Sequence, residues 1–143
     1  MANRVAHMKT NHGDIEIELF EDKAPVTTKN FIDLIEKGYY DGLTFHRVVP
    51  NFVLQGGSPA MNEYVGDGPF LRDELDLAHH DRYTLGISTR GRDTGDAQWF
   101  INLVDNYRLD HEYTVVGRIM SGFDVVDRIL EGDVMESVRI VPN

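Results

Sequence analysis

The segment FHRVVPNFVLQGG, residues 45–57, places a permanently charged arginine and a side-chain amide among aromatic and aliphatic residues. Its pattern predicts two strands joined by a turn at Pro50 and Asn51. Arg47 stays protonated and carries its hydrogen-bond donors in a fixed fork, and Gln55 carries both donors and an acceptor. An apolar surround strengthens such hydrogen bonds because the local dielectric is low. The segment could therefore stabilise a polar group of a ligand without transferring a proton.

The same residues also have ordinary structural interpretations. Strand alternation predicts that Arg47 shares a face with Phe45, and that Val53 and Gln55 share a face after the turn. Arg47 could then be a surface arginine or the partner in a buried ion pair. Phe52 could belong to the core, and Gln55 could satisfy backbone groups. The segment alone leaves these alternatives open.

Other segments carry residue types found in catalytic sites, but each lacks part of the expected pattern. GISTR, residues 86–90, begins like the nucleophile elbow of a serine hydrolase, but an arginine replaces the second glycine. RGRDTGDAQ, residues 90–98, lacks the Gly-Lys-Ser/Thr end of a phosphate-binding loop. HHD at 79–81 and DHE at 110–112 hold metal-ligand types, but adjacent residues of an extended chain point to opposite faces. We therefore expect no metal site and no cofactor.

Composition narrows the class of protein. The chain has 143 residues, 41% of them hydrophobic, with 24 acidic and 14 basic residues and a net charge of -10. These values indicate one globular domain over residues 1–143. Basic clusters typical of nucleic-acid binding and apolar runs of membrane-spanning length are both missing from the sequence. Without cysteine, disulfides and thiolate chemistry are excluded. The start of the chain has no signal-peptide pattern, so we expect a cytoplasmic protein.

Hydrophobic periodicity predicts a mainly β protein. Strict alternation in DIEIELF, residues 14–20, is typical of a half-exposed strand. Further strands are expected at residues 4–10, 44–49, 52–55, 85–89, 98–103, 114–120 and 136–141. Helices are expected from Pro25 to just before Gly38, and at about 123–131, with Ile129 and Leu130 on the buried face. These elements favour a closed eight-stranded antiparallel barrel capped by two α-helices, with loops over residues 58–83.

Four ordered segments resemble the cyclophilins, a family of peptidyl-prolyl cis–trans isomerases. FHRVVPNFVLQGG resembles the family's signature, and AQWFINL is similar to a second segment that usually reads Ser-Gln-Phe-Phe-Ile. PVTTKNFIDLIEKGYYDGLTFHRV and LDHEYTVVGRIMSGFDVVDRI resemble the first helix and the closing helix with their approaches. The matches cover almost the whole chain. The resemblance implies the eight-stranded barrel with two helices and an isomerase that needs no cofactor.

The implied reaction fits the chemistry of Arg47. Rotation about a peptide C–N bond has a barrier of about 18–20 kcal/mol, whereas the two X–Pro isomers differ by only about 0.5–1 kcal/mol. The twisted transition state loses conjugation, and the prolyl nitrogen regains a lone pair. A donor aimed at that nitrogen stabilises the twisted amide more than the planar one, which is the condition for catalysis.

The resemblance also implies roles for the residues around Arg47. Gln55 would orient the substrate carbonyl and Arg47, and a pocket would grip the proline ring. Rim groups would hold the flanking peptide backbone, and we interpret His46 as a core or rim histidine rather than a catalytic one. The implied pocket consists of Phe52, Val53, Phe100 and Leu109, and the implied rim of Ser88, Thr89, Gln98 and Tyr113.

Several positions depart from the common family pattern. Val53 replaces a frequent methionine and predicts a shallower pocket, and Thr89 shortens an amide contact to a hydroxyl. Arg108 stands where many members have tryptophan, which predicts only weak binding of the cyclic peptide cyclosporin. Tyr113 replaces a frequent histidine. None of these changes removes Arg47, so activity should survive.

Proline-containing peptides and unfolded or flexible protein chains are the expected partners, and the resemblance favours a monomer. Two other classes of function remain as alternatives: a non-catalytic module that docks proline-containing loops, and a structural scaffold domain. Retention of Arg47 together with Phe52, Gln55 and Phe100 favours the enzyme, because docking alone does not require a guanidinium.

Overall fold

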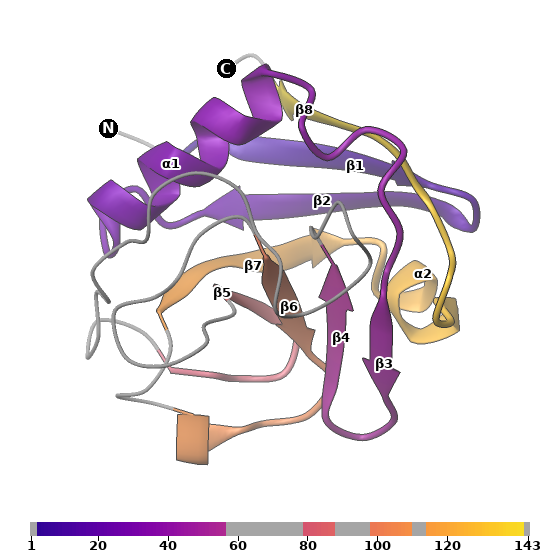
Figure 1. Ribbon diagram of the computed structural model, residues 1–143. Helices are drawn as coiled ribbons and strands as arrows, with labels where there is room; N and C mark the ends of the chain where they lie inside the picture. The colour runs from indigo at the N-terminus through magenta and orange to yellow at the C-terminus, as the bar shows by residue number, and fades with distance from the viewer. Residues whose placement is uncertain (1–2, 57–78, 88–97, 110–113, 142–143) are drawn as a thin grey trace.

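Eight antiparallel strands form one curled sheet in the computed structural model, which describes residues 3–56, 79–87, 98–109 and 114–141 (Figure 1). The strand order is β3-β4-β6-β5-β7-β2-β1-β8. The elements are β1 (Val5–Thr10), β2 (Gly13–Leu19), α1 (Pro25–Glu36), β3 (Arg47–Val49), β4 (Val53–Gly56), β5 (Thr84–Ile87), β6 (Trp99–Asn102), the 3-10 helix η1 (Tyr107–Leu109), β7 (Val115–Ser121), α2 (Phe123–Arg128) and β8 (Met135–Val141).

Alternating side chains explain why the β2 segment forms a strand. Ile15, Ile17 and Leu19 are fully buried in the core, whereas Glu18 on the opposite face accepts a 2.7 Å hydrogen bond from Arg118 of β7. This period of two matches the pleat of a strand that is covered on one face only. The predicted N-terminal hairpin is confirmed by the antiparallel pairing of β1 with β2.

The sheet curls into a half-barrel rather than a fully closed barrel. β3 and β8 are its two edges, and they do not pair with each other as strands. An isolated bridge between Thr44 and Val134 links the chain just before β3 to the chain just before β8. The backbone N–H of Phe45 also donates to the carbonyl of Asp133 at 2.8 Å. The predicted barrel is therefore confirmed in strand number and direction, but complete closure was overstated.

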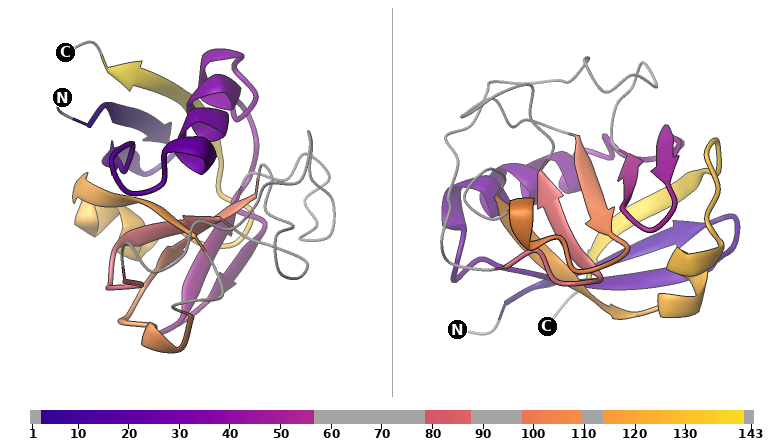
Figure 2. Two further views of the ribbon diagram at one scale, coloured as in Figure 1. Left: turned by 90° about the vertical axis from the view of Figure 1, so that its left-hand side faces the viewer. Right: turned by 90° about the horizontal axis from the view of Figure 1, so that it is seen from below.

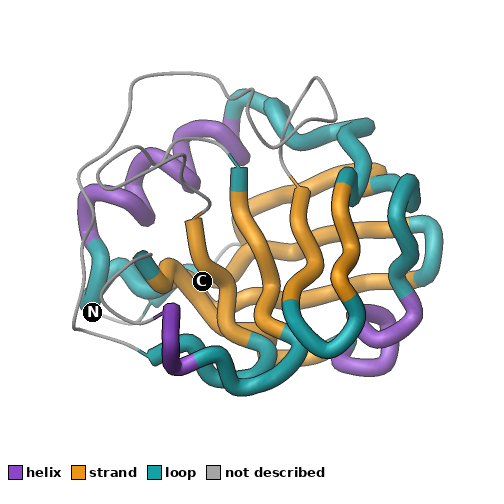
Figure 3. Tube along the Cα trace, turned by 60° about the horizontal axis from the view of Figure 1, so that its bottom comes forward, coloured by secondary structure: helices purple, strands orange, loops and turns teal. Residues whose placement is uncertain are grey.

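The two α-helices lie on different sides of the curled sheet (Figure 3). α1 contacts β8 and buries Phe31 and Ile35, whereas α2 contacts β2. The first and last strands, β1 and β8, lie side by side (Figure 2) and pair in antiparallel fashion. None of the helices in the described ranges is long and apolar enough to cross a membrane.

The second helix is shorter than the sequence predicts. α2 ends at Arg128, and Ile129 adopts an extended conformation. Ile129 still packs into the core, but Leu130 is 67% exposed. The expectation that Leu130 lies on the buried face was therefore wrong, because the helical period stops two residues before it.

Candidate active site

A row of residues crosses four neighbouring strands on one face of the sheet. Arg47 of β3 lies opposite Gln55 of β4, and Gln55 lies opposite Phe100 of β6. Phe100 in turn lies opposite Gly86 of β5. Residues directly opposite each other in a sheet point to the same face. The register therefore gathers the predicted arginine, amide and aromatic ring side by side.

Arg47 and Gln55 are joined directly by their side chains. The Nη1 group of Arg47 donates a 3.0 Å hydrogen bond to Oε1 of Gln55. Gln55 is only 6% exposed, while Arg47 is half-buried. The amide of Gln55 thus holds one nitrogen of the guanidinium in place. Because the guanidinium is planar, this bond also restricts the directions of its other N–H groups.

Phe45 lies on the opposite face of the sheet from Arg47. It is fully buried and meets the edge of Trp99, with the ring centroids 5.8 Å apart at 80°. Trp99 lies opposite Gly56 and therefore faces the core, away from Gln55. The prediction that Phe45 and Arg47 share a face was wrong, because regular strand pairing begins only at Arg47. The guanidinium does not interrupt the apolar core; it belongs to the sheet's other face.

The ring of Phe100 is held closely by its surroundings. A Cβ atom at Gly86 would lie 2.5 Å from Cζ of Phe100, so the ring occupies the space that any side chain there would need. The imidazole of His80 stacks on the ring, with centroids 5.7 Å apart and planes 11° from parallel. Phe100 is 5% exposed and His80 is fully buried. The position of the ring is therefore determined by packing.

The turn between β3 and β4 follows the predicted Pro50–Asn51 pattern. The backbone N–H of Phe52 donates to the carbonyl of Val49 at 3.1 Å, and Asn51 has a positive φ of 58°. Proline at the second position and asparagine at the third suit a turn of this shape. The turn leads directly into Val53, which is 4% exposed and lies on the same face as Gln55.

Of the other predicted site residues, some lie within the described ranges and some lie outside them. Leu109 ends η1 and is half-buried, and Gln98, just before β6, is 3% exposed. Both ring nitrogens of His46 are buried, in agreement with a core or rim position. Ser88, Thr89 and Tyr113 lie outside the described residues, as does DHE at 110–112, so their roles remain predictions. Within the described ranges, no three His, Asp or Glu side chains gather to hold a metal ion.

Sequence reasoning missed a set of buried polar residues that lie next to this row. They are His80, Thr84, Asn102 and Asn106, each of them 7% exposed or less. Their hydrogen bonds connect β5, β6 and the turn before β4. The available signal was a polar asparagine at the end of the apolar strand WFIN, because a buried polar side chain requires partners.

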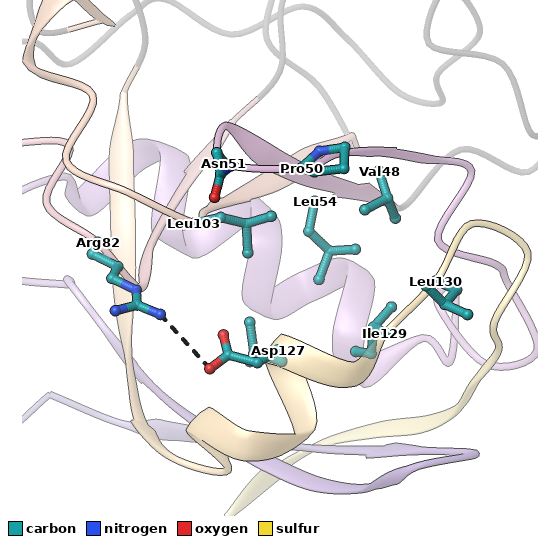
Figure 4. A pocket seen from close by; sticks show the side chains of 10 residues that line it. Val48, Pro50, Asn51, Leu54, Arg82, Leu103, Asp127, Ile129 and Leu130 are labelled. Carbon is teal, nitrogen blue, oxygen red and sulfur yellow. Dashed lines mark ion pairs between the residues drawn. The ribbon is translucent and has the colours of Figure 1, made fainter.

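A separate pocket lies on the core side of the β3–β4 hairpin (Figure 4). It has a volume of about 310 Å³ and is lined mainly by aliphatic side chains, including Val48, Leu54 and Leu130. Asp127 of α2 pairs with Arg82 at 3.7 Å on its margin. None of the predicted site residues lines this pocket, so it is distinct from the row that contains Arg47.

An antiparallel half-barrel that presents an arginine, an amide and an aromatic ring in one row defines a class of protein, and comparison with known proteins agrees. Residues 5–143 match the family described as cyclophilin type peptidyl-prolyl cis-trans isomerase/CLD. A peptidyl-prolyl cis-trans isomerase of Helicobacter pylori is 45% identical over 139 residues, which cover 93% of this chain and 84% of that protein. Peptidyl-prolyl cis-trans isomerase B of Bacillus subtilis is 41% identical over 128 residues, which cover 88% and 90%.

Solved structures show the same likeness. The crystal structure of a Cryptosporidium parvum cyclophilin type peptidyl-prolyl cis-trans isomerase matches with a TM-score of 0.91 and 26% identity over 99% of both chains. The structure determined in the presence of the dipeptide Ala-Pro matches with a TM-score of 0.89 and 26% identity, over 97% of this chain and 99% of that one. This chain belongs to the cyclophilin-type peptidyl-prolyl cis-trans isomerase family. Its activity is peptidyl-prolyl cis–trans isomerisation.

Proposed function

We propose that Arg47 accelerates rotation about X–Pro bonds by donating a hydrogen bond to the prolyl nitrogen of the twisted amide. In the planar ground state the nitrogen lone pair is delocalised into the carbonyl, so it is a poor acceptor. In the twisted state the lone pair returns to nitrogen and accepts the hydrogen bond. The interaction therefore forms mainly in the transition state and lowers the barrier without covalent chemistry.

The observation that carries this proposal is the 3.0 Å hydrogen bond from Arg47 Nη1 to Gln55 Oε1, in a row that continues to Phe100. The arginine side chain is long and flexible when it is free, so the guanidinium must be restrained before it can act on one atom of a substrate. Gln55 supplies that restraint from the neighbouring strand. Phe100 supplies an apolar surface two strands away, where a proline ring could pack against it.

The remaining residues are assigned by the family pattern and by their position. Phe52, Val53, Phe100 and Leu109 would grip the proline ring, with Val53 leaving a shallower pocket than methionine. His46 would lie at the rim of this pocket. The proposed contacts to the flanking peptide backbone come from Ser88, Thr89, Gln98 and Tyr113.

Proline-containing peptides and unfolded or flexible protein chains are the proposed substrates, so the protein would assist protein folding. A relative was crystallised in the presence of Ala-Pro, which supports a proline-containing peptide as ligand. We further propose that the protein acts as a monomer in the cytoplasm. Arg108 is the reason to propose weak rather than strong binding of cyclosporin.

The proposal is tested by NMR exchange spectroscopy on an Ala-Pro peptide. Wild-type protein should accelerate the exchange of the cis and trans signals, and Arg47→Ala should lose about 100-fold or more of that acceleration, as with loss of a transition-state donor. Arg118→Ala is a matched control, since Arg118 is an exposed arginine of β7 whose side chain pairs with Glu18 at 2.7 Å. Equal rates for Arg47→Ala and wild type would remove Arg47 from the mechanism.

A further inference from the structure

The hydrogen bonds among the buried polar residues beside the active-site row have a single consistent assignment of donors and acceptors. The hydroxyl of Thr84 donates to the carbonyl of Asp81 at 2.6 Å, so its oxygen is an acceptor for Nδ2 of Asn102 at 3.0 Å. Nδ2 of Asn102 also lies 3.0 Å from Nδ1 of His80. Oδ1 of Asn102 accepts from Nδ2 of Asn106 at 2.9 Å. These bonds fix the orientation of both amides and leave Nδ1 of His80 as an acceptor.

Asn106 is the point at which this network meets the proposed proline pocket. Its side chain also donates to the carbonyl of Phe52 at 3.0 Å. Its backbone N–H donates to the carbonyl of His80 at 2.7 Å, and its carbonyl accepts from the N–H of Leu109 at 2.9 Å. Asn106 is 7% exposed, so water cannot readily replace these partners. A single side chain and its backbone thus connect three separate segments.

The network reaches Phe100 through the ring of His80. Nδ1 of the imidazole bonds the side-chain amide of Asn102 at 3.0 Å. The imidazole lies nearly parallel to the Phe100 ring, with the ring centroids 5.7 Å apart. The Phe100 ring also lies directly against Gly86 of β5, so it cannot move closer to that strand. Phe52, Leu109 and Phe100, three of the four residues assigned to the proline pocket, are therefore linked to Asn106 directly or through His80.

We propose that Asn106 is a positioning residue that sets the shape of the proline pocket. This inference rests on the proposed function of that pocket. Asn106 touches no substrate atom in this scheme. Its amide holds the carbonyl of Phe52 and Oδ1 of Asn102, and Asn102 in turn holds His80 beside Phe100. Its bonds to Leu109 and to the carbonyl of His80 are made by the backbone and remain when the side chain is replaced. The pocket grips the proline ring equally in the planar and the twisted amide. Its loosening should therefore weaken substrate binding and leave the rotation step unchanged.

The test is a comparison of Asn106→Ala with wild type, using exchange kinetics and peptide titration on an Ala-Pro peptide. We expect KM and the dissociation constant to rise about fivefold, with kcat within about twofold of wild type. The ring signals of Phe100 should also shift in the proton NMR spectrum. A matched control is Thr28→Ala, because the buried hydroxyl of Thr28 donates to the carbonyl of Phe20 at 3.1 Å in a part of the fold remote from the row.

Thr28→Ala should lose comparable stability with unchanged KM and unchanged Phe100 signals. If Asn106→Ala does not fold, Thr84→Val decides, since it removes the acceptor that fixes Asn102 and should raise KM in the same direction. An unchanged KM in a folded Asn106 variant, or an equal rise in the Thr28 control, would overturn the inference. Failure of the proposed pocket has a different signature, because Phe100→Ala would then bind the peptide as tightly as wild type does.

Discussion

Substitution of Gly86 by alanine should displace Phe100 and impair catalysis without touching any polar group of the site. The added Cβ would lie 2.5 Å from Cζ of Phe100 and 3.0 Å from both Cε atoms. Ordinary contact between carbon atoms requires about 3.5–4.0 Å, so the ring must move by about 1 Å. Because His80 stacks on one side of the ring, the movement has to be outward or sideways.

The magnitude follows from packing and from geometry. Overpacking of this kind costs about 1–3 kcal/mol of the free energy of unfolding, so the variant should still fold. A misplacement of about 1 Å in a binding group can reduce catalytic efficiency by about 100-fold. We expect kcat/KM for an Ala-Pro peptide to fall about 10- to 100-fold, mostly through KM.

The assay is exchange spectroscopy on the peptide, with urea unfolding to measure stability. Gly117→Ala is the matched control, since its Cβ would lie equally close, 2.5 Å, to the carbonyl oxygen of Glu18. Gly117 pairs with Leu85, so its Cβ would point to the opposite face of the sheet from Phe100. That control should lose stability and keep its KM. A folded Gly86→Ala variant with wild-type kcat/KM would refute the placement of the proline pocket at Phe100.

Three further predictions concern charge, metal and aromatic contacts. The backbone N–H of Leu130, with Asn11 and His12, lowers the pKa of Asp133. The stability from this group is therefore present above about pH 4 and is lost as the pH falls below it, so Asp133→Asn should be less stable by about 1 kcal/mol at pH 7, with the difference shrinking in acid unfolding curves. Addition of EDTA should leave the isomerisation rate unchanged, and a large loss would contradict a mechanism without metal. Phe100→Ala should weaken peptide binding by a few kcal/mol at most, as measured by titration, and unaltered binding would mean that the pocket lies elsewhere.

Sequence patterns predicted the strands well where one face is buried. Alternation of Ile15 and Ile17 with Glu16 gives β2 a signal of period two that no helix would produce. The turn at Pro50 and Asn51 was predicted because its backbone geometry depends on those two residues alone. Local causes of this kind can be found in a single sequence.

Features that depend on distant contacts could not be predicted in the same way. α2 ends at Arg128, where Ile129 becomes extended and packs into the core. The isolated bridge between Thr44 and Val134 joins two segments that are far apart in the sequence. Phe45 faces the core and packs against Trp99, although strand alternation predicted that it lies on the same face as Arg47.

The candidate site likewise contains residues that could be predicted from the sequence and one that could not. Arg47 and Gln55 stood out as polar residues in an apolar segment, and the resemblance to cyclophilins implied their roles. The register then showed that they are direct neighbours. Asn106 had no signal of its own, because a polar residue in an irregular segment is usually exposed. Only the folded arrangement shows that its amide supports the carbonyl of Phe52.

The central claim is that Arg47 stabilises the twisted amide more than the planar one. The most direct measurement compares the Arg47→Ala variant with wild type on one Ala-Pro peptide, in both the exchange rate of the bound peptide and its dissociation constant. The account predicts that bound-state exchange slows by about 100-fold or more while the dissociation constant changes by less than about threefold. A variant whose dissociation constant weakens as much as its overall efficiency, with bound-state exchange preserved, would show that Arg47 only binds substrate.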